Sequence, residues 1–165
     1  MINKLSSDTN QRILQRLIEI HKECISKTNS QFYNQEQINE WISTIKLENI
    51  QNQLDSTTWI IVKNNHEIVG FAQYCLEDKE VYQIQIDPIE QGKGYGRELY
   101  KYIENDFKFN KIKHISLFAT LNSVQFYKSL GFNVVEEIKF PLVKTEIKMI
   151  KMSKTLNQNV KDLIQ

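Results

Sequence analysis

Apolar residues recur at helical spacing in the first third of the chain. Between residues 10 and 24 they fall three or four positions apart, and Asp8 or Thr9 precedes them as a candidate N-cap. A second run with similar spacing begins near Asn34 and continues to Ile45. The sequence therefore predicts two helices here, followed by a polar stretch over residues 48–57.

The middle of the chain changes to the pattern of strands, in which β-branched and aromatic residues stand between short polar turns. A hairpin turn at Asn64-Asn65 and a second turn at residues 77–79 connect three predicted strands, at residues 58–62, 68–76 and 80–86. Beyond Gly96 the helical spacing returns and continues to Phe107. The remaining predicted elements are a strand at 112–118, a short helix at 123–130 closed by Gly131, and strands at 132–138 and 145–152.

This order of elements predicts one α+β domain over residues 1–154. Its centre would be a mixed, mostly antiparallel twisted sheet flanked by about four helices. A first strand near residues 2–5 is weakly marked, and residues 155–165 are expected to form a polar tail. No internal repeat and no linker rich in glycine, proline or serine divides the chain.

Charge and cysteine content argue against several classes of protein. The 21 basic and 20 acidic side chains give a net charge of +1, whereas a general nucleic-acid binder usually carries a basic excess. Cys24 and Cys75 form no CxxC pair and the three histidines share no spacing, so we expect a reducing compartment and no metal site. No apolar run approaches the ~20 residues of a membrane span. The chain is therefore predicted to be cytoplasmic and to bind neither nucleic acid nor membranes.

Three glycines at alternate positions, Gly92, Gly94 and Gly96, lie between a predicted strand and a predicted helix. Glycine at such a turn lets backbone N–H groups face a ligand, and the helix N-terminus adds partial positive charge. Lys93 and Arg97 can add charge-assisted contacts. The loop predicts an anion site suited to a pyrophosphate, and a glycine-rich turn without a ligand is the alternative.

Other nucleotide-binding loops do not fit these residues. The dinucleotide fingerprint requires a third glycine where this chain has Arg97, and it opens a βαβ unit rather than following three antiparallel strands. A Walker loop ends in Gly-Lys followed by Ser or Thr, and that ending is absent. A kinase loop requires catalytic and metal-binding motifs downstream, which are also absent.

The loop and a second segment together resemble the GNAT superfamily of acyl-CoA N-acyltransferases. In that family a strand leads into a loop with Gln or Arg, Gly three positions later, and Gly or Ala two positions after that. Residues 84–88 and 91–97 match this motif. A second family element, a strand and a short helix ending Phe-Tyr-x-x-x-Gly-Phe, is matched by residues 117–120 and 126–132. The two motifs stand in the family order, and the resemblance covers nearly the whole chain.

Further positions look like the YafP-type bacterial branch of this superfamily. They are residues 33–37 with Trp41, the position of Glu80, and the closing residues 149–152. Thr120 stands where many superfamily members carry asparagine, and this branch often has a small hydroxyl residue there.

The resemblance implies acetyl-CoA as co-substrate and no metal. It implies that residues 84–86 splay from the neighbouring strand and offer backbone N–H groups to the thioester oxygen and pantetheine, helped by a β-bulge. Thr120 and Asn122 would hydrogen-bond the pantetheine amides, and Asn122 also fits the N-cap of the helix at Ser123. The implied cofactor-binding residues are Ile84, Gln85, Ile86, Gln91, Gly92, Lys93, Gly94, Tyr95, Gly96, Arg97, Thr120 and Asn122.

Four further residues receive roles from the resemblance. Tyr127 would be the general acid toward the CoA thiolate, although a helical tyrosine beside phenylalanine is otherwise a half-buried core residue. Glu80 would be the general base or hold the amine, and a solvated strand-initial glutamate is the alternative. Tyr33 and Trp41 would contact the acceptor, with core packing as the alternative for Trp41.

The leading hypothesis for function is an N-acetyltransferase acting on a primary amine of a small molecule, peptide or protein in a ternary complex. A GNAT-like acyl-CoA sensor without transfer activity is the second hypothesis, and Glu80 and Tyr127 favour the enzyme. An accessory protein of nucleic acids is the third, against which the balanced charge argues. A homodimer is common in the superfamily and is expected as a possibility.

Overall fold

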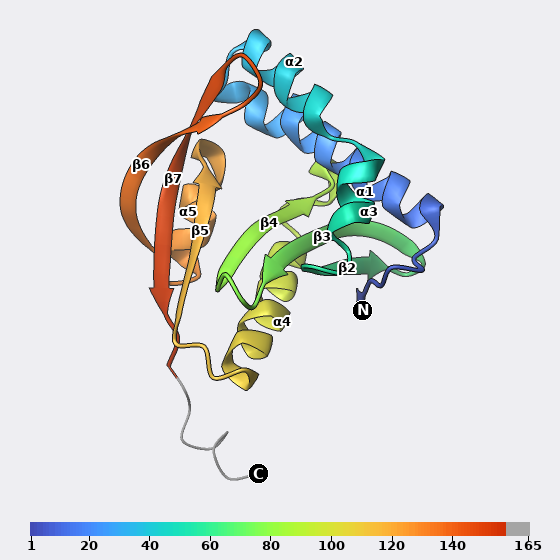
Figure 1. The fold of residues 1–165 in the computed structure, drawn as a ribbon, viewed down its shortest axis with the longest axis vertical. Helices are drawn as coiled ribbons and strands as arrows, with labels where there is room; N and C mark the ends of the chain where they lie inside the picture. Colours follow the sequence, from blue (N-terminus) through green and yellow to red (C-terminus); the bar gives the residue numbers. More distant parts are fainter. Residues whose placement is uncertain (158–165) are drawn as a thin grey trace.

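A mixed sheet forms the centre of the fold, in the strand order β1-β2-β3-β4-β5-β7-β6 (Figure 1). The computed structural model describes residues 1–157. The strands are β1 (Ile2–Lys4), β2 (Thr58–Asn64), β3 (Glu67–Cys75), β4 (Glu80–Ile86), β5 (His114–Thr120), β6 (Asn133–Pro141) and β7 (Glu146–Thr155). Neighbouring strands are antiparallel except β4 and β5. The predicted α+β class with a mixed, mostly antiparallel sheet is confirmed.

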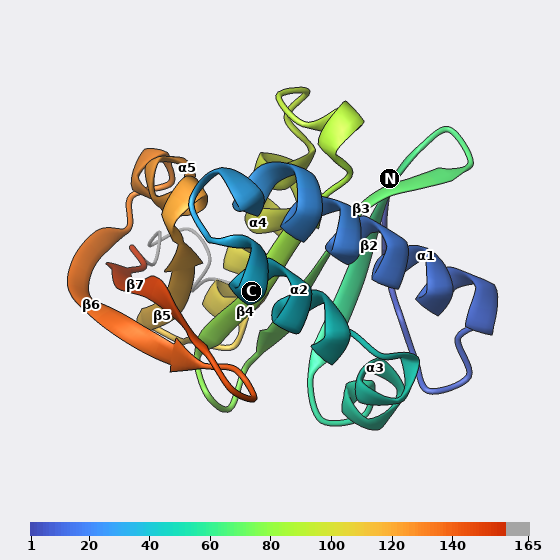
Figure 2. The ribbon, with the colours of Figure 1, turned by 90° about the horizontal axis from the view of Figure 1, so that it is seen from above.

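Helices cover both faces of this sheet. They are α1 (Gln11–Glu23), α2 (Gln35–Thr44), α3 (Leu47–Gln53), α4 (Tyr95–Phe109) and α5 (Val124–Ser129). Short π- and 3-10 turns, η1 (Cys24–Thr28), η2 (Asn29–Gln31), η3 (Pro88–Glu90) and η4 (Leu121–Ser123), connect them to the strands. Figure 2 shows α1 and α2 crossing over the strands of one half of the sheet.

Helix α3 corrects the sequence prediction, which expected only a polar stretch over residues 48–57. Ile50 and Leu54 lie four positions apart in that stretch and are both buried, in the same cluster as α1 and Trp59. One apolar stripe of two residues is enough because tertiary contacts stabilise a short helix that its own sequence would not.

The start of α1 and the turn between β2 and β3 also differ from prediction by a residue or two. The N-cap of α1 is Asn10, whose side chain accepts the Arg12 N–H at 2.8 Å, rather than Asp8 or Thr9. The turn between β2 and β3 falls one residue later than predicted, since Asn64 still pairs with Glu67.

The two faces of the sheet bury separate sets of side chains. On one face, Ile60, Ala72 and Tyr74 pack with the apolar stripe of α4, which includes Leu99 and Ile103. On the opposite face, Trp59, Ile61 and Phe71 pack with Leu17 and Ile18 of α1. Alternate residues of β2 and β3 therefore face alternate layers, as the two-residue period of a strand requires.

Strands β4 and β5 are paired only where they begin. The parallel pairing comprises Glu80 with Ser116 and Val81 with Leu117, and Figure 1 shows the strands separating beyond that point. On the other side of β4, the register with β3 shifts between Gln73 and Tyr74, leaving Tyr82 as an extra residue in β4. A bulged strand bends and twists more than a regular one, and here the bulge lies next to the separation.

The tip of the β6–β7 hairpin is held against α2. The carboxylate of Glu40 accepts the backbone N–H groups of Lys144 and Thr145, the latter at 2.8 Å, and also the Thr145 hydroxyl. The Gln37 amide donates to the carbonyl of Glu146 at 2.7 Å. Helix α2 and the hairpin thus form one connected wall.

The C-terminal strand reaches slightly beyond the predicted domain limit at residue 154. Thr155 is the last residue of β7, and Leu156 is buried in the α4-side core. The main-chain N–H of Leu156 donates to the carbonyl of Lys113 at 2.7 Å. The remainder of the predicted tail, from residue 158 onward, lies outside the described residues.

Candidate active site

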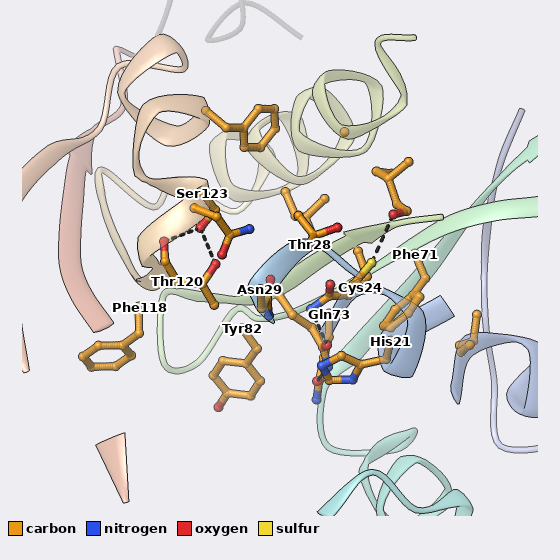
Figure 3. A pocket seen from close by; sticks show the side chains of 18 of the residues that line it. His21, Cys24, Thr28, Asn29, Phe71, Gln73, Tyr82, Phe118, Thr120 and Ser123 are labelled. Carbon is orange, nitrogen blue, oxygen red and sulfur yellow. Dashed lines mark hydrogen bonds between the residues drawn. The ribbon is translucent and has the colours of Figure 1, made fainter. Parts of the chain in front are cut away.

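A cleft of about 840 Å³ extends from the separation of β4 and β5 to the face covered by α1, α2 and α3 (Figure 3). It brings most of the predicted site residues together. Those in its lining are Trp41, Glu80, Ile84, Gln85, Ile86, Gln91, Gly92, Gly94, Tyr95, Gly96, Arg97, Thr120, Asn122 and Tyr127. Lys93 and Tyr33 are the predicted site residues outside that lining.

The glycine loop adopts a backbone that favours glycine at two positions. Gly92 has φ of 79° and Gly94 has φ of 92°, and α4 begins directly afterwards at Tyr95. Left-handed φ values of this kind disfavour residues with a Cβ. The free N–H groups of the first turn of α4 therefore face the cleft end, where an anion would gain from the helix dipole.

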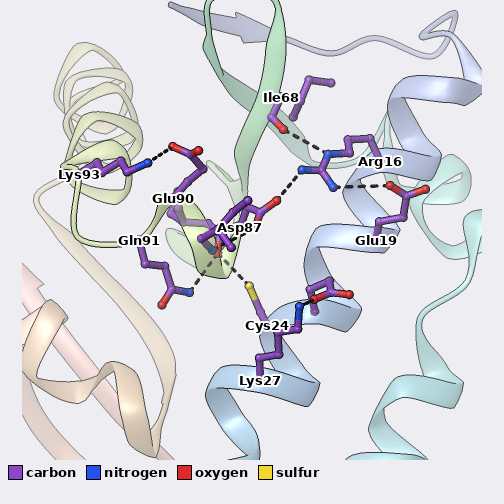
Figure 4. Close-up of polar contacts among 12 residues, drawn as sticks. Arg16, Glu19, Cys24, Lys27, Ile68, Asp87, Glu90, Gln91 and Lys93 are labelled. Carbon is purple, nitrogen blue, oxygen red and sulfur yellow. Dashed lines mark hydrogen bonds and ion pairs between the residues drawn. The ribbon is translucent and has the colours of Figure 1, made fainter.

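Gly96 is required for a different reason, the close approach of α5. A Cβ at Gly96 would lie 3.2 Å from Cζ of Phe126, which also lines the cleft. Arg97 of α4 also contacts α5, since its guanidinium donates to the Ser129 hydroxyl at 3.1 Å. Lys93 instead pairs with Glu90 at 2.9 Å, so its ammonium is partly neutralised in this arrangement (Figure 4).

The end of β4 is fixed by contacts from α1 and η1 (Figure 4). Arg16 pairs with Asp87 at 2.6 Å. The carbonyl of Ile86, which no longer has a neighbouring strand on the open side, accepts from the Cys24 thiol at 3.1 Å and the Gln91 amide at 3.0 Å. The loop therefore starts from a rigid point.

The edge of β4 that faces β5 has no strand partner over most of its length. Beyond Val81 no residue of β4 pairs with β5, and the strand there is half-buried or exposed, so its main-chain N–H and C=O groups on this side are open to a hydrogen-bonding ligand. Ile84 and Ile86 pack toward the α4-side core, while Gln83 and Gln85 point to the opposite face. An extended ligand in the separation can take the place of a strand along this edge.

Tyr127 lines the cleft from α5 with 6% of its surface exposed. Its ring packs edge-on against Phe126 and Phe132, with centroid distances of 5.1 and 5.7 Å. Its hydroxyl has no hydrogen-bond partner among residues 1–157. Burial raises the pKa of the Tyr127 phenol above its usual value, so the hydroxyl stays protonated and is available as a donor.

Glu80 lies at the closed end of the separation, paired with Ser116 of β5 and Cys75 of β3. Burial raises the pKa of the Glu80 carboxyl, the charge of Asp78 raises it further, and Lys151 opposes both. A carboxylate with a raised pKa is a stronger base. Asp78 in turn accepts a hydrogen bond from the Tyr82 hydroxyl.

Thr120 and Asn122 stand where β5 ends. The Thr120 hydroxyl donates to Ser123, which itself bonds the Thr120 carbonyl, both at 2.9 Å. Oδ1 of Asn122 is buried and has no partner within the described residues. Asn122 lies within η4 and makes no cap contact with α5, so its carbonyl oxygen remains free for a ligand N–H.

The two aromatics predicted to contact the acceptor have different positions. Trp41 of α2 lines the cleft, whereas Tyr33 lies behind Trp41. The two rings are in edge-on contact, with their centroids 5.6 Å apart. The Tyr33 hydroxyl accepts the Leu121 N–H at 3.1 Å and donates to the Lys148 carbonyl at 2.7 Å. Both capacities of the hydroxyl are thus used within the fold, joining the ends of β5 and β7.

Several cleft residues were not singled out from the sequence. Gln73 and Gln83 form a hydrogen-bonded pair on the α1-side face, and His21 of α1 lies beside Gln73 (Figure 3). Glutamine at alternate positions of one strand, 83 and 85, was a signal that both face one layer. The link to Gln73 depends on strand register and carries no local signal.

Residues 1–157 contain neither a cluster of metal-ligating side chains nor a membrane-spanning helix. No group of three or more His, Cys, Asp or Glu side chains is placed to hold a metal ion in this part of the chain. None of the helices that the structure describes has both the length and the apolar character needed to cross a bilayer.

The separated parallel strand pair and the left-handed glycine loop at a helix N-terminus lie where the resemblance to acyl-CoA N-acyltransferases implied a cofactor site. Residues 29–156 match the acetyltransferase (GNAT) domain family. The chain belongs to the GNAT acetyltransferase family.

Solved structures with the same fold include members bound to CoA. A GCN5-related N-acetyltransferase of Rhodopseudomonas palustris superposes with a TM-score of 0.86 at 16% identity, over 94% of this chain and 95% of that one. The PaiA N-acetyltransferase of Thermoplasma acidophilum, in complex with coenzyme A, gives 0.74 at 21% identity over 94% and 99%. YncA of Salmonella typhimurium, with acetyl-CoA, gives 0.65 at 17% identity over 96% of both chains.

Relatives by sequence carry the name ycf52. The ycf52-like N-acetyltransferase of Prochlorococcus marinus is 32% identical over 71 residues, which span 41% of this chain and 39% of the relative. The ycf52 N-acetyltransferase of Pyropia yezoensis is 28% identical over 117 residues, or 65% of this chain and 67% of the relative.

Proposed function

We propose that this chain transfers an acetyl group from acetyl-CoA to a primary amine of a small molecule, peptide or protein, by direct attack within a ternary complex. The open edge of β4 beside the glycine loop is the observation that carries the proposal. It is the arrangement that a long ligand with an anionic end and an amide-containing arm would fit.

The binding roles follow from the groups left free in the fold. The loop from Gln91 to Arg97 would hold the pyrophosphate, with the N-terminal turn of α4 as the positive end. The backbone of residues 84–86 would bond pantetheine. The unpartnered Oδ1 of Asn122 is matched to an amide N–H, because a buried acceptor without a donor costs about 1–3 kcal/mol. Thr120 would contact the same arm.

Glu80 is the proposed general base. Acetyl-CoA supplies the activated acyl group, and the attacking amine must lose a proton to present its lone pair. Burial and Asp78 raise the pKa of Glu80 and so increase its affinity for that proton. Its position at the closed end of the separation lies beside the bulge at Tyr82.

Tyr127 is the proposed proton donor to the departing sulfur. Its hydroxyl is protonated, unpartnered within the described chain, and directed by a ring that Phe126 and Phe132 hold on two sides. Backbone N–H groups of β4 would stabilise the charge that develops on the carbonyl oxygen, an effect of about 3 kcal/mol per donor in a dry site.

Two measurements test the proposal together. Calorimetry with CoA should show binding, and release of free thiol from acetyl-CoA should accelerate when primary amines are added. Absence of CoA binding would contradict the assignment. Binding without thiol release for any amine would favour the non-catalytic sensor instead.

Finer assignments also remain proposals. Residues 33–37 and 149–152 with Trp41 support a place in the YafP-type branch. Trp41, at the cleft, would contact the acceptor, and Tyr33 would support it from behind. We further propose one acetyltransferase domain over residues 1–154 with a polar tail, a cytoplasmic location and a homodimer.

A further inference from the structure

The cleft contains a chain of side-chain amides on the face of β3 and β4 that is turned toward α1 and α3. Gln73 is 3% exposed and uses its amide fully. Its Nε2 donates to Gln53 at 2.7 Å and to Thr57 at 3.0 Å, and its Oε1 accepts from Gln83 at 2.9 Å. Gln85 donates in turn to Oε1 of Gln83 at 3.4 Å.

The direction of this chain is fixed at Thr57. The Thr57 hydroxyl has one proton, which it donates to the main-chain carbonyl of Gln53 at 2.9 Å. The indole N–H of Trp59 can only donate, and it uses one lone pair of the same hydroxyl at 3.0 Å. The remaining lone pair requires a donor, so Gln73 must present its NH₂ group to Thr57 and its oxygen to Gln83.

The orientation of each amide group then fixes the orientation of the next one. Because Gln83 must donate to the Gln73 oxygen, its own oxygen faces Gln85 and the cleft. Gln85 donates to the Gln83 oxygen, so Oε1 of Gln85 is directed away from the other amides. This Oε1 has no hydrogen-bond partner within residues 1–157. The amide network thus directs the carbonyl oxygens of Gln83 and Gln85 to positions where they can accept N–H groups, while one N–H of each NH₂ group is used within the network.

The rest of the cleft on the α1 side of the sheet is apolar and almost uncharged. Trp59 and Phe71 stack at 5.9 Å in its floor, and His21 packs edge-on to Phe71 at 6.2 Å (Figure 3). Burial lowers the pKa of His21 to about 4, so the ring is neutral at physiological pH. Among the cleft residues contributed by α1 to α3, β2 and β3, the charged side chain is Lys46, a cation.

Resting on the proposed acetyl transfer, we propose that the acceptor is a primary monoamine with an uncharged, apolar body. Its N–H groups are accepted by the amide oxygens of Gln83 and Gln85, and its body lies against Trp41 and Phe71. The carboxylates of the cleft are Glu80, the proposed base for the reacting amine, and Glu90, the partner of Lys93. Since the wall formed by α1 to α3, β2 and β3 has no carboxylate and carries Lys46, a second ammonium lying against it would be without a partner. Gln73 and Thr57 act as positioning residues.

The substrate class is tested with two amines, 2-phenylethylamine and spermidine, by release of CoA thiol from the full chain. We expect kcat/KM for 2-phenylethylamine to exceed that for spermidine by at least about tenfold. Preference for spermidine, or no release with 2-phenylethylamine while calorimetry shows CoA binding, would overturn the acceptor class and leave the cofactor site standing. Loss of CoA binding itself would instead contradict the proposed function.

The amide chain is tested at Thr57, which lies outside the cleft lining. Thr57→Val removes the hydroxyl that fixes the direction of Gln73, and Thr57→Ser keeps it. We expect Thr57→Val to raise KM for 2-phenylethylamine about five- to tenfold with KM for acetyl-CoA unchanged, and Thr57→Ser to match the wild type.

Two outcomes decide this second test. Equal KM values for the amine in a folded Thr57→Val variant would overturn the positioning role. If that variant does not fold, Gln83→Met provides the same comparison on β4, where an unchanged amine KM would also contradict the proposal.

Discussion

Val81 and Leu117 form the last paired position between β4 and β5, and beyond them the two strands separate. Both residues are buried, 1% exposed each, and both belong to the core beneath α4. The separation therefore begins from a well-packed point and is not fraying of the sheet. The position of the proposed acyl site depends on where this pairing stops.

Gly94→Glu should abolish CoA binding. The new side chain places a carboxylate at the N-terminus of α4, where the proposed pyrophosphate lies, and forces a residue with a Cβ to adopt φ of 92°. Calorimetry with CoA measures the effect. Gly94→Gln is the control for strain, because it has similar size without the charge and should weaken binding less. Unchanged CoA affinity in folded Gly94→Glu would sink the assignment of the loop.

Tyr127→Phe should lower kcat about a hundredfold or more, with a smaller effect on KM for acetyl-CoA, because only the proton donor is lost. Steady-state kinetics with saturating amine measure this. Tyr100→Phe is a matched control, since Tyr100 is also buried but its hydroxyl bonds Lys154 away from the cleft. Wild-type turnover in Tyr127→Phe would remove its role as the acid.

The pH dependence of kcat/KM should contain a rising acid limb governed by Glu80. Its base form exists above its pKa, which burial and Asp78 raise. Asp78→Asn removes one cause of the shift, so the limb should move to lower pH. Glu80→Gln should remove the limb and most of the activity. If the pH profile of Glu80→Gln were identical to that of the wild type, Glu80 would be a solvated residue at the start of the strand without a catalytic role.

Glu80 should also reduce the stability of the fold at neutral pH. A carboxyl whose pKa is raised on folding contributes most stability below its unfolded pKa and loses that contribution as pH rises through the folded value. Glu80→Gln should therefore raise Tm at pH 7 and have little effect near pH 4. A lower Tm at pH 7 would contradict the direction of this shift.

Glu104 should stabilise the fold with the opposite pH dependence. Burial alone would raise the pKa of Glu104, but hydrogen bonds from Lys108 and Lys154 outweigh it and hold the pKa at about 2. The stabilisation is therefore present above the unfolded pKa and is lost as pH falls through about 2. Glu104→Gln should lower Tm at pH 7 by about 2–4 °C for each kcal/mol of stability lost in a domain of this size, and the difference from the wild type should disappear near pH 2.

An exposed glutamate provides the control for this measurement. Glu136 meets Lys151 at 4.0 Å on the surface, and exposed pairs of this kind contribute about 0–1 kcal/mol. Glu136→Gln should leave Tm nearly unchanged at both pH values. An equal loss in both variants would show that general charge, and not the Glu104 contacts, sets the stability.

The hydrophobic spacing predicted most of the fold because each amphipathic element buries its own apolar face. The prediction failed at α3, where Ile50 and Leu54 are the apolar residues within a polar run, and packing against α1 decides the conformation. The local pattern also could not show where β4 and β5 separate, since that depends on the partner that each strand finds across the sheet.

The candidate site was predicted where its chemistry is local. Gly92, Gly94 and Gly96 lie within five consecutive residues, and Gly92 and Gly94 adopt the positive φ values that glycine permits. The amide chain was not predicted, because Thr57, Gln73 and Gln83 come from three segments that only strand register brings together. Tyr33, which is near Trp41 in sequence, was predicted to face the acceptor, yet its hydroxyl bonds the backbone behind the cleft.

The contact of Glu40 with the β6–β7 hairpin has an evolutionary consequence. Its carboxylate accepts main-chain N–H groups of Lys144 and Thr145, so the attachment depends little on which side chains the tip carries. Homologous proteins could therefore exchange residues of this hairpin, including Phe140 and Ile147 where its strands line the cleft, while the tip stays attached. Adaptation to new acceptors would need few compensating substitutions elsewhere.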